Sequence, residues 1–127
     1  MISVCIPAYN FDITSLVKVL LIQAAELGVP YEILVIDDVS DDSFRQKNRV
    51  IKDWQGVRYI ESSSKLGRAT IRNRLATESA YDHLIFMDCD SLTKDNQYLV
   101  RYIPFCSNNT VVSGGRIYDQ VPPRDKR

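Results

Sequence analysis

Two pairs of aspartates carry the clearest chemical signal in this sequence of 127 residues. Asp37 and Asp38 are adjacent, Asp88 and Asp90 are separated by one residue, and each pair directly follows an apolar run. Carboxylates held this close repel one another unless a cation or hydrogen-bond donors lie beside them. Their oxygens suit a hard divalent cation such as Mg²⁺ or Mn²⁺. The same spacing also fits polar strand ends without any ligand, because aspartate favours turns.

The elements that must position these acids follow from hydrophobic periodicity. Apolar runs that predict buried strands occupy residues 2–7, 31–37, 57–60 and 83–87. Helical spacing of apolar residues occupies residues 16–27, 44–54, 67–79 and 95–103, and a fifth strand is expected over 111–113. Strands that alternate with helices predict an α/β fold, in which a mostly parallel sheet has helices on both faces.

Ligands of such sheets bind at the carboxyl ends of the strands. We therefore expect chemistry in the segments that follow the first four predicted strands, which are residues 7–10, 37–40, 62–67 and 88–91. Both aspartate pairs lie in these segments. The sequence thus predicts one site at one edge of the sheet.

Composition limits the classes of protein and of partner. The chain has 16 basic and 16 acidic residues, so it lacks the positive charge typical of proteins that bind nucleic acid. Charged and amide residues interrupt every apolar stretch well before the roughly 20 residues that a membrane span needs. Three widely spaced cysteines, outside any CxxC pattern, argue against a disulfide framework and a zinc site. They favour a reducing, cytoplasmic setting.

Four motifs occur in order between Ile2 and Ser91. They are Pro7-Ala8-Tyr9-Asn10, Asp37-Asp38-Val39-Ser40, the segment from Gly67 through Arg72 to Asn73, and Asp88-Cys89-Asp90. Together they resemble the nucleotide-sugar-binding half of the GT-A fold, family 2 glycosyltransferases. The resemblance implies a Rossmann-like nucleotide-binding half and a nucleotide-sugar donor.

The resemblance also implies roles for the first two motifs. Pro7, Ala8 and Tyr9 would hold the nucleobase, with the Tyr9 ring alongside it. Asp38 would accept the N3–H of uracil, because an ionised carboxylate only accepts hydrogen bonds, and Asp37 would support the loop. The donor implied is therefore a UDP-sugar.

The last two motifs would meet the rest of the donor. Gly67 and Arg72 would lie near the base and the diphosphate, where N–H groups and a guanidinium favour negative charge. Asp88 would bind the ribose hydroxyls, and Asp90 a Mn²⁺ or Mg²⁺ ion that bridges the phosphates. The sequence departs from the family at two positions, with Lys65 where asparagine is common and Arg68 where alanine is common. Both side chains are expected either to contact phosphate or to face solvent.

The activity that the resemblance implies is inverting transfer of a sugar to a hydroxyl acceptor, a carbohydrate or a lipid-linked molecule, in polysaccharide or glycolipid synthesis. A carboxylate in the acceptor-binding half serves the family as general base. Asp119 and Asp125 are the only acids after Asp95, and neither lies in a family motif. We therefore expect the base beyond Arg127, and residues 1–127 to be a nucleotide-sugar-binding portion that is truncated before the acceptor-binding half and inactive in transfer on its own.

Two other interpretations stay open at this point. A nucleotidyltransferase has a similar sheet but usually a Gly-rich, basic loop after the first strand, and residues 7–12 contain no such loop. A receiver-like module that binds Mg²⁺ places its acid pair after the first strand, whereas here the pair follows the second. The expected location is the cytoplasm, or the cytoplasmic face of the membrane for the full-length enzyme.

Overall fold

The fold is known from a computed structural model, which describes residues 1–107 and 109–115. Its sheet has four strands in the order β3-β2-β1-β4, and every pairing is parallel. The strands are β1 (Ile2–Ala8), β2 (Tyr31–Asp37), β3 (Val57–Glu61) and β4 (Leu84–Phe86). The predicted α/β class with a parallel sheet is confirmed.

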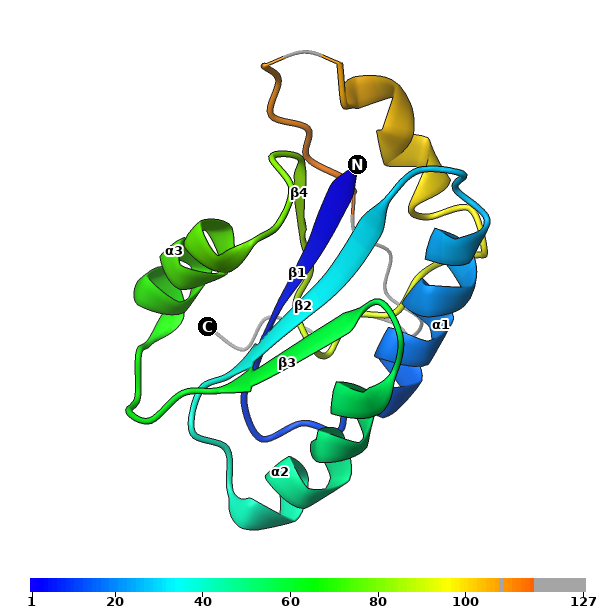
Figure 1. Cartoon of the computed structure of the whole chain (residues 1–127). Helices are drawn as coiled ribbons and strands as arrows, with labels where there is room; N and C mark the ends of the chain where they lie inside the picture. Colours follow the sequence, from blue (N-terminus) through cyan, green and yellow to red (C-terminus); the bar gives the residue numbers. More distant parts are fainter. Residues whose placement is uncertain (108, 116–127) are drawn as a thin grey trace, which may run out of the picture.

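Helices cover both faces of this sheet, as predicted. Helix α3 (Arg68–Glu78) lies on one face, while α1 (Thr14–Ala25) and α2 (Asp42–Asn48) lie on the other (Figure 1). Alternate residues of β1 point to opposite sides, so Val4 and Ile6 join the core under α1, and Cys5 joins the core under α3. Burial on both faces explains why β1 and β2 are nearly continuous apolar runs.

Helix α1 is fixed at both ends by the residues that its sequence supplies. The Asp12 carboxylate accepts hydrogen bonds from the Thr14 N–H at 3.1 Å and from the Thr14 hydroxyl at 2.7 Å. Gly28 follows the helix with φ +67°, a conformation that favours glycine. Within the helix the buried Gln23 side chain accepts the Leu99 N–H at 3.1 Å and donates to the Asp95 carbonyl at 3.1 Å. This contact holds the segment after β4 against α1.

Two of the predicted helices differ in the structure. Helix α2 ends at Asn48, and a 3₁₀ helix η1 (Arg49–Asp53) completes the segment. The helix expected over 95–103 is instead a 3₁₀ helix η2 (Val100–Phe105), in which Pro104 lacks the N–H of a continuing α-helix.

The strand predicted at 111–113 is wrong. Within the described part of the chain these residues pair with no strand, and the Val111 side chain is wholly exposed, so its β-branched shape has no pleated neighbour there to pack against. A Cβ atom on Gly114 would meet the Tyr102 hydroxyl, so the Tyr102 side chain would have to shift to admit another residue. Predictions for Asp119, for Asp125 and for an irregular tail from 121 lie outside the described residues. No helix in the described ranges is long and apolar enough to cross a membrane.

Candidate functional site

A cavity of about 250 Å³ lies where the strands end, between the loop after β1, the loop after β2 and the start of α3. It brings together every residue that the sequence predicts to bind nucleotide. These residues are Pro7, Ala8, Tyr9, Asp38, Gly67, Arg72 and Asp88. The parallel topology accounts for this gathering, because it places the carboxyl ends of β1, β2 and β4 on the same edge.

The loops after β1 and β2 are joined by a polar network that the sequence analysis missed. The fully buried Asp37 carboxylate accepts the Ser40 N–H at 2.8 Å and the Ser40 hydroxyl at 2.5 Å. The Ser40 Oγ in turn accepts the Asn10 N–H at 2.9 Å, and Asn10 Oδ1 accepts the Asp41 N–H at 2.8 Å. Asp37 therefore supports the loop rather than lining the cavity, in keeping with the role expected for it.

The tight turn after β2 holds Val39 in an unfavourable conformation. Its φ of +61° lies in the left-handed region, which β-branched residues rarely adopt. The Asp38 N–H donates to the Ala8 carbonyl at 2.8 Å, and Ser40 is held by Asp37, so Val39 is constrained from both sides. Strain of this kind persists only where neighbouring contacts fix the backbone, and it gathers at functional sites.

The Asp38 side chain connects the loop after β2 to the start of α3. Its Oδ1 accepts the Leu66 N–H at 2.6 Å, and its Oδ2 accepts the Gly67 N–H at 3.1 Å. Gly67 has φ +79°, so glycine is required at this turn. Each carboxylate oxygen has two lone pairs, so Asp38 keeps acceptor capacity toward the cavity after these two bonds.

Lys65 covers the face of Tyr9, a position that the sequence analysis left undecided. Its Nζ lies 3.1 Å from the centre of the Tyr9 ring, and 3.5 Å from Asp38 Oδ2. It also donates to the Asp38 carbonyl at 3.2 Å. The Tyr9 ring itself is half exposed, which is typical of an aromatic residue at the mouth of a binding site.

Arg72 and Asp88 form an ion pair across the cavity. Arg72 Nη2 lies 2.5 Å from Asp88 Oδ1, and both side chains are one-third exposed. The Arg72 guanidinium also lies 5.7 Å from the Phe86 ring centre. The pair orients both side chains, and it leaves the other guanidinium nitrogens available as donors to a ligand.

Two further lining residues come from the helix and from the acid motif. Ile71 and Cys89 line the cavity, although the sequence analysis gave Cys89 no binding role and did not single out Ile71. Ile71 follows Gly67 by one helical turn, and that spacing is the signal by which it could have been found. Burial raises the pKa of the Cys89 thiol, and the charges of Asp90 and Asp88 act in the same direction. Cys89 is thus a neutral thiol near pH 7.

Asp90 lies beside the cavity and not in its lining. Its side chain is exposed, next in sequence to Asp88 and Cys89, which do line the cavity. Within residues 1–107 and 109–115, no group of three or more His, Cys, Asp or Glu side chains is placed to hold a metal ion. This donor set suits a cation shared between one carboxylate and the phosphates of a ligand, as Mg²⁺ is often held.

The chemistry available is therefore that of binding a polar, anionic ligand. Lys65, Arg68 and Arg72 bring three positive charges to the lining, and Asp38 and Asp88 bring two negative ones. Arg68 is exposed on the first turn of α3 but still lines the cavity. His83 lies away from the cavity, at the other end of the sheet, where its carbonyl accepts the Ser3 N–H.

Comparison with known proteins identifies a matching family and several similar solved structures. The family described as Glycosyl transferase family 2 matches residues 3–127. A search of curated proteins finds no match. Among solved structures, the mannosyltransferase PcManGT from Pyrobaculum calidifontis, in complex with GDP-Man and Mn²⁺, is 21% identical with a TM-score of 0.67. That match covers 87% of this chain and 33% of the mannosyltransferase.

A second solved structure has the same fold. TarS residues 1-349 from S. aureus, in complex with UDP-GlcNAc, is 22% identical with a TM-score of 0.61, and the match covers 82% of this chain and 30% of TarS. The matched part of this chain therefore corresponds to about a third of the length of each of these two structures.

Proposed function

The chain belongs to glycosyl transferase family 2, and from this membership we propose that it is the nucleotide-sugar-binding portion of an inverting, metal-dependent glycosyltransferase. The observation that carries the proposal is the cavity at the strand ends, lined by all the residues that the four motifs assign to nucleotide. Membership of this family decides against the nucleotidyltransferase and receiver alternatives.

The donor in this proposal is a UDP-sugar. Asp38 faces the cavity next to Tyr9, and its carboxylate would accept the N3–H of uracil while the Tyr9 ring packs along the base. The similar structures are complexes with GDP-Man and with UDP-GlcNAc, so GDP is the natural competitor in any test.

The remaining groups serve the ribose and the diphosphate. Asp88, oriented by Arg72, would bind the ribose hydroxyls, and Arg72 with the start of α3 at Gly67 would favour the negative phosphates. Asp90 would hold Mn²⁺ or Mg²⁺, which when bound stabilises negative charge on the departing diphosphate. The mannosyltransferase complex with Mn²⁺ supports a divalent cation here.

The general base and the acceptor-binding half lie outside residues 1–127 in this proposal. The greater length of the similar structures supports this division. The acceptor is a hydroxyl of a carbohydrate or of a lipid-linked molecule, and the product a polysaccharide or glycolipid. We place the protein in the cytoplasm or at the cytoplasmic face of a membrane, on the strength of its unpaired cysteine pattern.

Thermal unfolding of the 127-residue chain tests the proposal. A ligand at 100 times its Kd stabilises the folded state by about 2.7 kcal/mol and so raises the Tm. We expect UDP with Mn²⁺ to raise the Tm more than UDP with EDTA, because EDTA removes the cation that Asp90 would hold beside the phosphates. Asp90→Asn should remove the part of the shift that depends on Mn²⁺. Asp53→Asn, which changes an exposed aspartate in η1, is the matched control and should retain it. Equal Tm values in all conditions would refute the proposal.

A further inference from the structure

Lys65 occupies the position that the nucleobase would need. Its ammonium lies on the Tyr9 ring, 3.1 Å from the ring centre, and 3.5 Å from Asp38 Oδ2. Both groups are those against which the base is expected to lie. The Lys65 side chain is 54% exposed, so it reaches the site from solvent on a flexible stem and is free to move. A base that enters must therefore displace the ammonium from both contacts.

The displaced ammonium stays next to the base, where it can donate hydrogen bonds but cannot accept them. A lysine ammonium has three donors and no acceptor, whereas the Asp38 carboxylate is an acceptor only. Lys65 is also anchored at its backbone, one residue before the Leu66 N–H that donates to Asp38. The two side chains thus present a donor and an acceptor side by side at the same edge of the ligand.

Nucleobases differ in how they match such a pair. Uracil and guanine carry a carbonyl oxygen adjacent to a ring N–H, which gives the lysine an acceptor and the aspartate a donor. Cytosine and adenine carry an amino group adjacent to a bare ring nitrogen, so a donor faces the ammonium and an acceptor faces the carboxylate. A donor that faces the ammonium, or an acceptor that faces the carboxylate, leaves desolvated polar groups without hydrogen-bond partners. A site of this kind discriminates strongly between the two types of base.

We propose that Lys65 is a specificity-determining residue of the base site, which together with Asp38 selects bases that have a carbonyl next to a ring N–H. The inference rests on the proposed function, since it assumes that the cavity binds a nucleotide. It goes beyond the roles implied by the four motifs, because these motifs give Lys65 no role at the base and leave it either to contact phosphate or to face solvent.

The test compares affinities for UDP, CDP, GDP and ADP by isothermal titration calorimetry. Comparing UDP with CDP, and GDP with ADP, cancels the difference in size between pyrimidines and purines. We expect the 127-residue chain to bind the carbonyl-bearing member of each pair roughly tenfold more tightly, the size of one charged hydrogen bond. Lys65→Met, which keeps a long unbranched side chain and removes its charge, should lower each ratio about threefold or more by weakening UDP and GDP relative to CDP and ADP.

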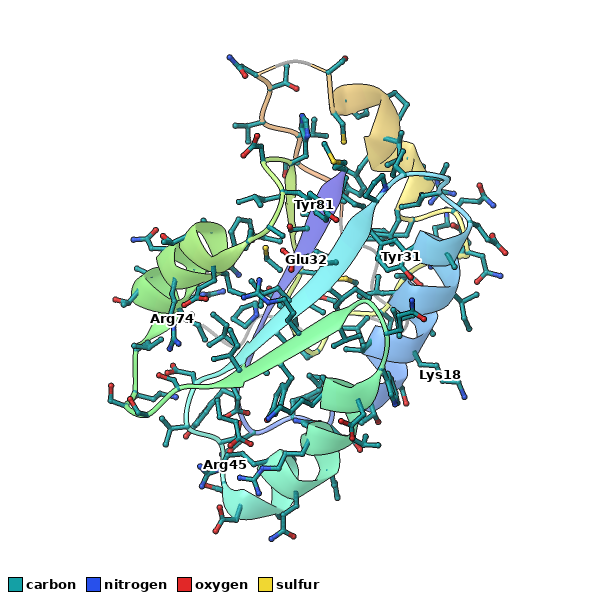
Figure 2. The ribbon with its side chains drawn as sticks, viewed as in Figure 1. Lys18, Tyr31, Glu32, Arg45, Arg74 and Tyr81 are labelled. Carbon is teal, nitrogen blue, oxygen red and sulfur yellow. The ribbon has the colours of Figure 1, made fainter. Side chains whose placement is uncertain are left out.

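Two further variants serve as controls. Lys65→Arg retains a positive donor and should keep the ratios near those of the unsubstituted chain. Lys18→Met changes an exposed lysine on α1, away from α3 and the strand ends (Figure 2), and should leave all four affinities unchanged. Thermal unfolding of Lys65→Met would be measured to check that the fold is intact.

The outcomes separate this inference from the proposed function. If Lys65→Met weakens all four nucleotides equally, Lys65 contacts the diphosphate, and the inference is overturned. Ratios that do not change in Lys65→Met overturn it as well. If the unsubstituted chain binds none of the four nucleotides, the proposed function itself fails.

Discussion

At the scale of single residues, the loop after β2 combines strain with a fixed hydrogen-bond pattern. Val39 lies at φ +61° because Asp38 and Ser40, on either side, are held by Ala8 and by Asp37. The left-handed region costs an L-residue about 1–2 kcal/mol, and asparagine tolerates it better than a β-branched residue does.

Relieving this strain should stabilise the protein. We expect Val39→Asn to raise the free energy of unfolding by about 1 kcal/mol, measured by urea denaturation. Val39→Thr keeps the β-branched shape and should change the stability by less than about 0.5 kcal/mol. If both variants are destabilised to the same extent, packing of Val39 and not its backbone conformation governs the position.

Individual site residues differed in how far the sequence could predict them. Tyr9 and Asp38 directly follow β1 and β2, and Asp88 lies two residues after β4. The period of the apolar runs and the topology rule for parallel sheets therefore bring the three residues together. The position of Lys65 depends on the turn that Gly67 makes and on two bonds to Asp38, and no local pattern encodes that geometry. The hydrogen bond from the Asn10 N–H to the Ser40 Oγ was missed for the same reason, because it joins two loops.

At the scale of elements, a buried carboxylate joins β1, β2 and the segment before β4. Glu32 accepts the Ser3 hydroxyl at 2.6 Å, the Ala80 N–H at 2.5 Å and Arg58 Nη1 at 3.2 Å. The Tyr81 N–H donates to the Ser3 hydroxyl at 3.2 Å, and Figure 2 shows Glu32 and Tyr81 near each other. Burial alone would raise the pKa of Glu32, but these hydrogen bonds and the charge of Arg58 hold that pKa below its usual value.

This lowered pKa makes stability depend on pH. A carboxyl group whose folded pKa is lowered contributes fully above its unfolded pKa, and the contribution is lost as the pH falls through the folded pKa. We expect Glu32→Gln to cost about 2 kcal/mol at pH 7, and the difference from the unsubstituted chain to shrink at pH 3. Urea denaturation at both pH values measures this.

Glu78→Gln provides the matched control for Glu32. Glu78 lies 3.6 Å from the same Arg58 but is more than a third exposed, so its substitution should cost less than about 0.5 kcal/mol at either pH. A cost for Glu32→Gln that stays constant from pH 7 to pH 3 would show that packing, not charge, holds these elements together.

Elements with a single dominant period were predictable, and those set by tertiary contacts were not. The strands β1 and β2 are apolar on both faces, so their runs determine their limits. The segment after β4 is held by Gln23, a polar residue on the apolar face of α1, and it forms a 3₁₀ helix instead of the α-helix that its own spacing indicates. Val111 and Val112 have strand propensity but no partner strand among the described residues.

At the scale of the whole molecule, the sheet has one short pairing that spans most of the described chain. β1 pairs with β2 and β2 with β3, each across one helical crossover, whereas β4 returns to β1 and pairs Ser3 with Leu84. Contacts between residues far apart in the sequence lose more loop-closure entropy when they form than local contacts do. The three-residue β4 is therefore expected to join the sheet late in folding.

Folding kinetics would reveal this order. We expect Val35→Ala in β2 to slow folding, with a φ-value above about 0.5, and Ile85→Ala in β4 mainly to speed unfolding, with a φ-value below about 0.3. Both side chains are buried, so each substitution changes stability enough to measure. A φ-value for Ile85 as high as that for Val35 would mean that β4 docks in the transition state.

If β4 docks late, as we expect, the lifetime of the nucleotide-bound protein is affected. Asp88 lies two residues after β4 and is paired with Arg72 of α3, so the half of the cavity assigned to ribose and phosphate would be completed only in the last step. A nucleotide that needs both halves then binds the native state but not the transition state. Such a ligand slows the unfolding of the chain and leaves its folding rate unchanged. The half-life of the folded protein becomes longer as a result.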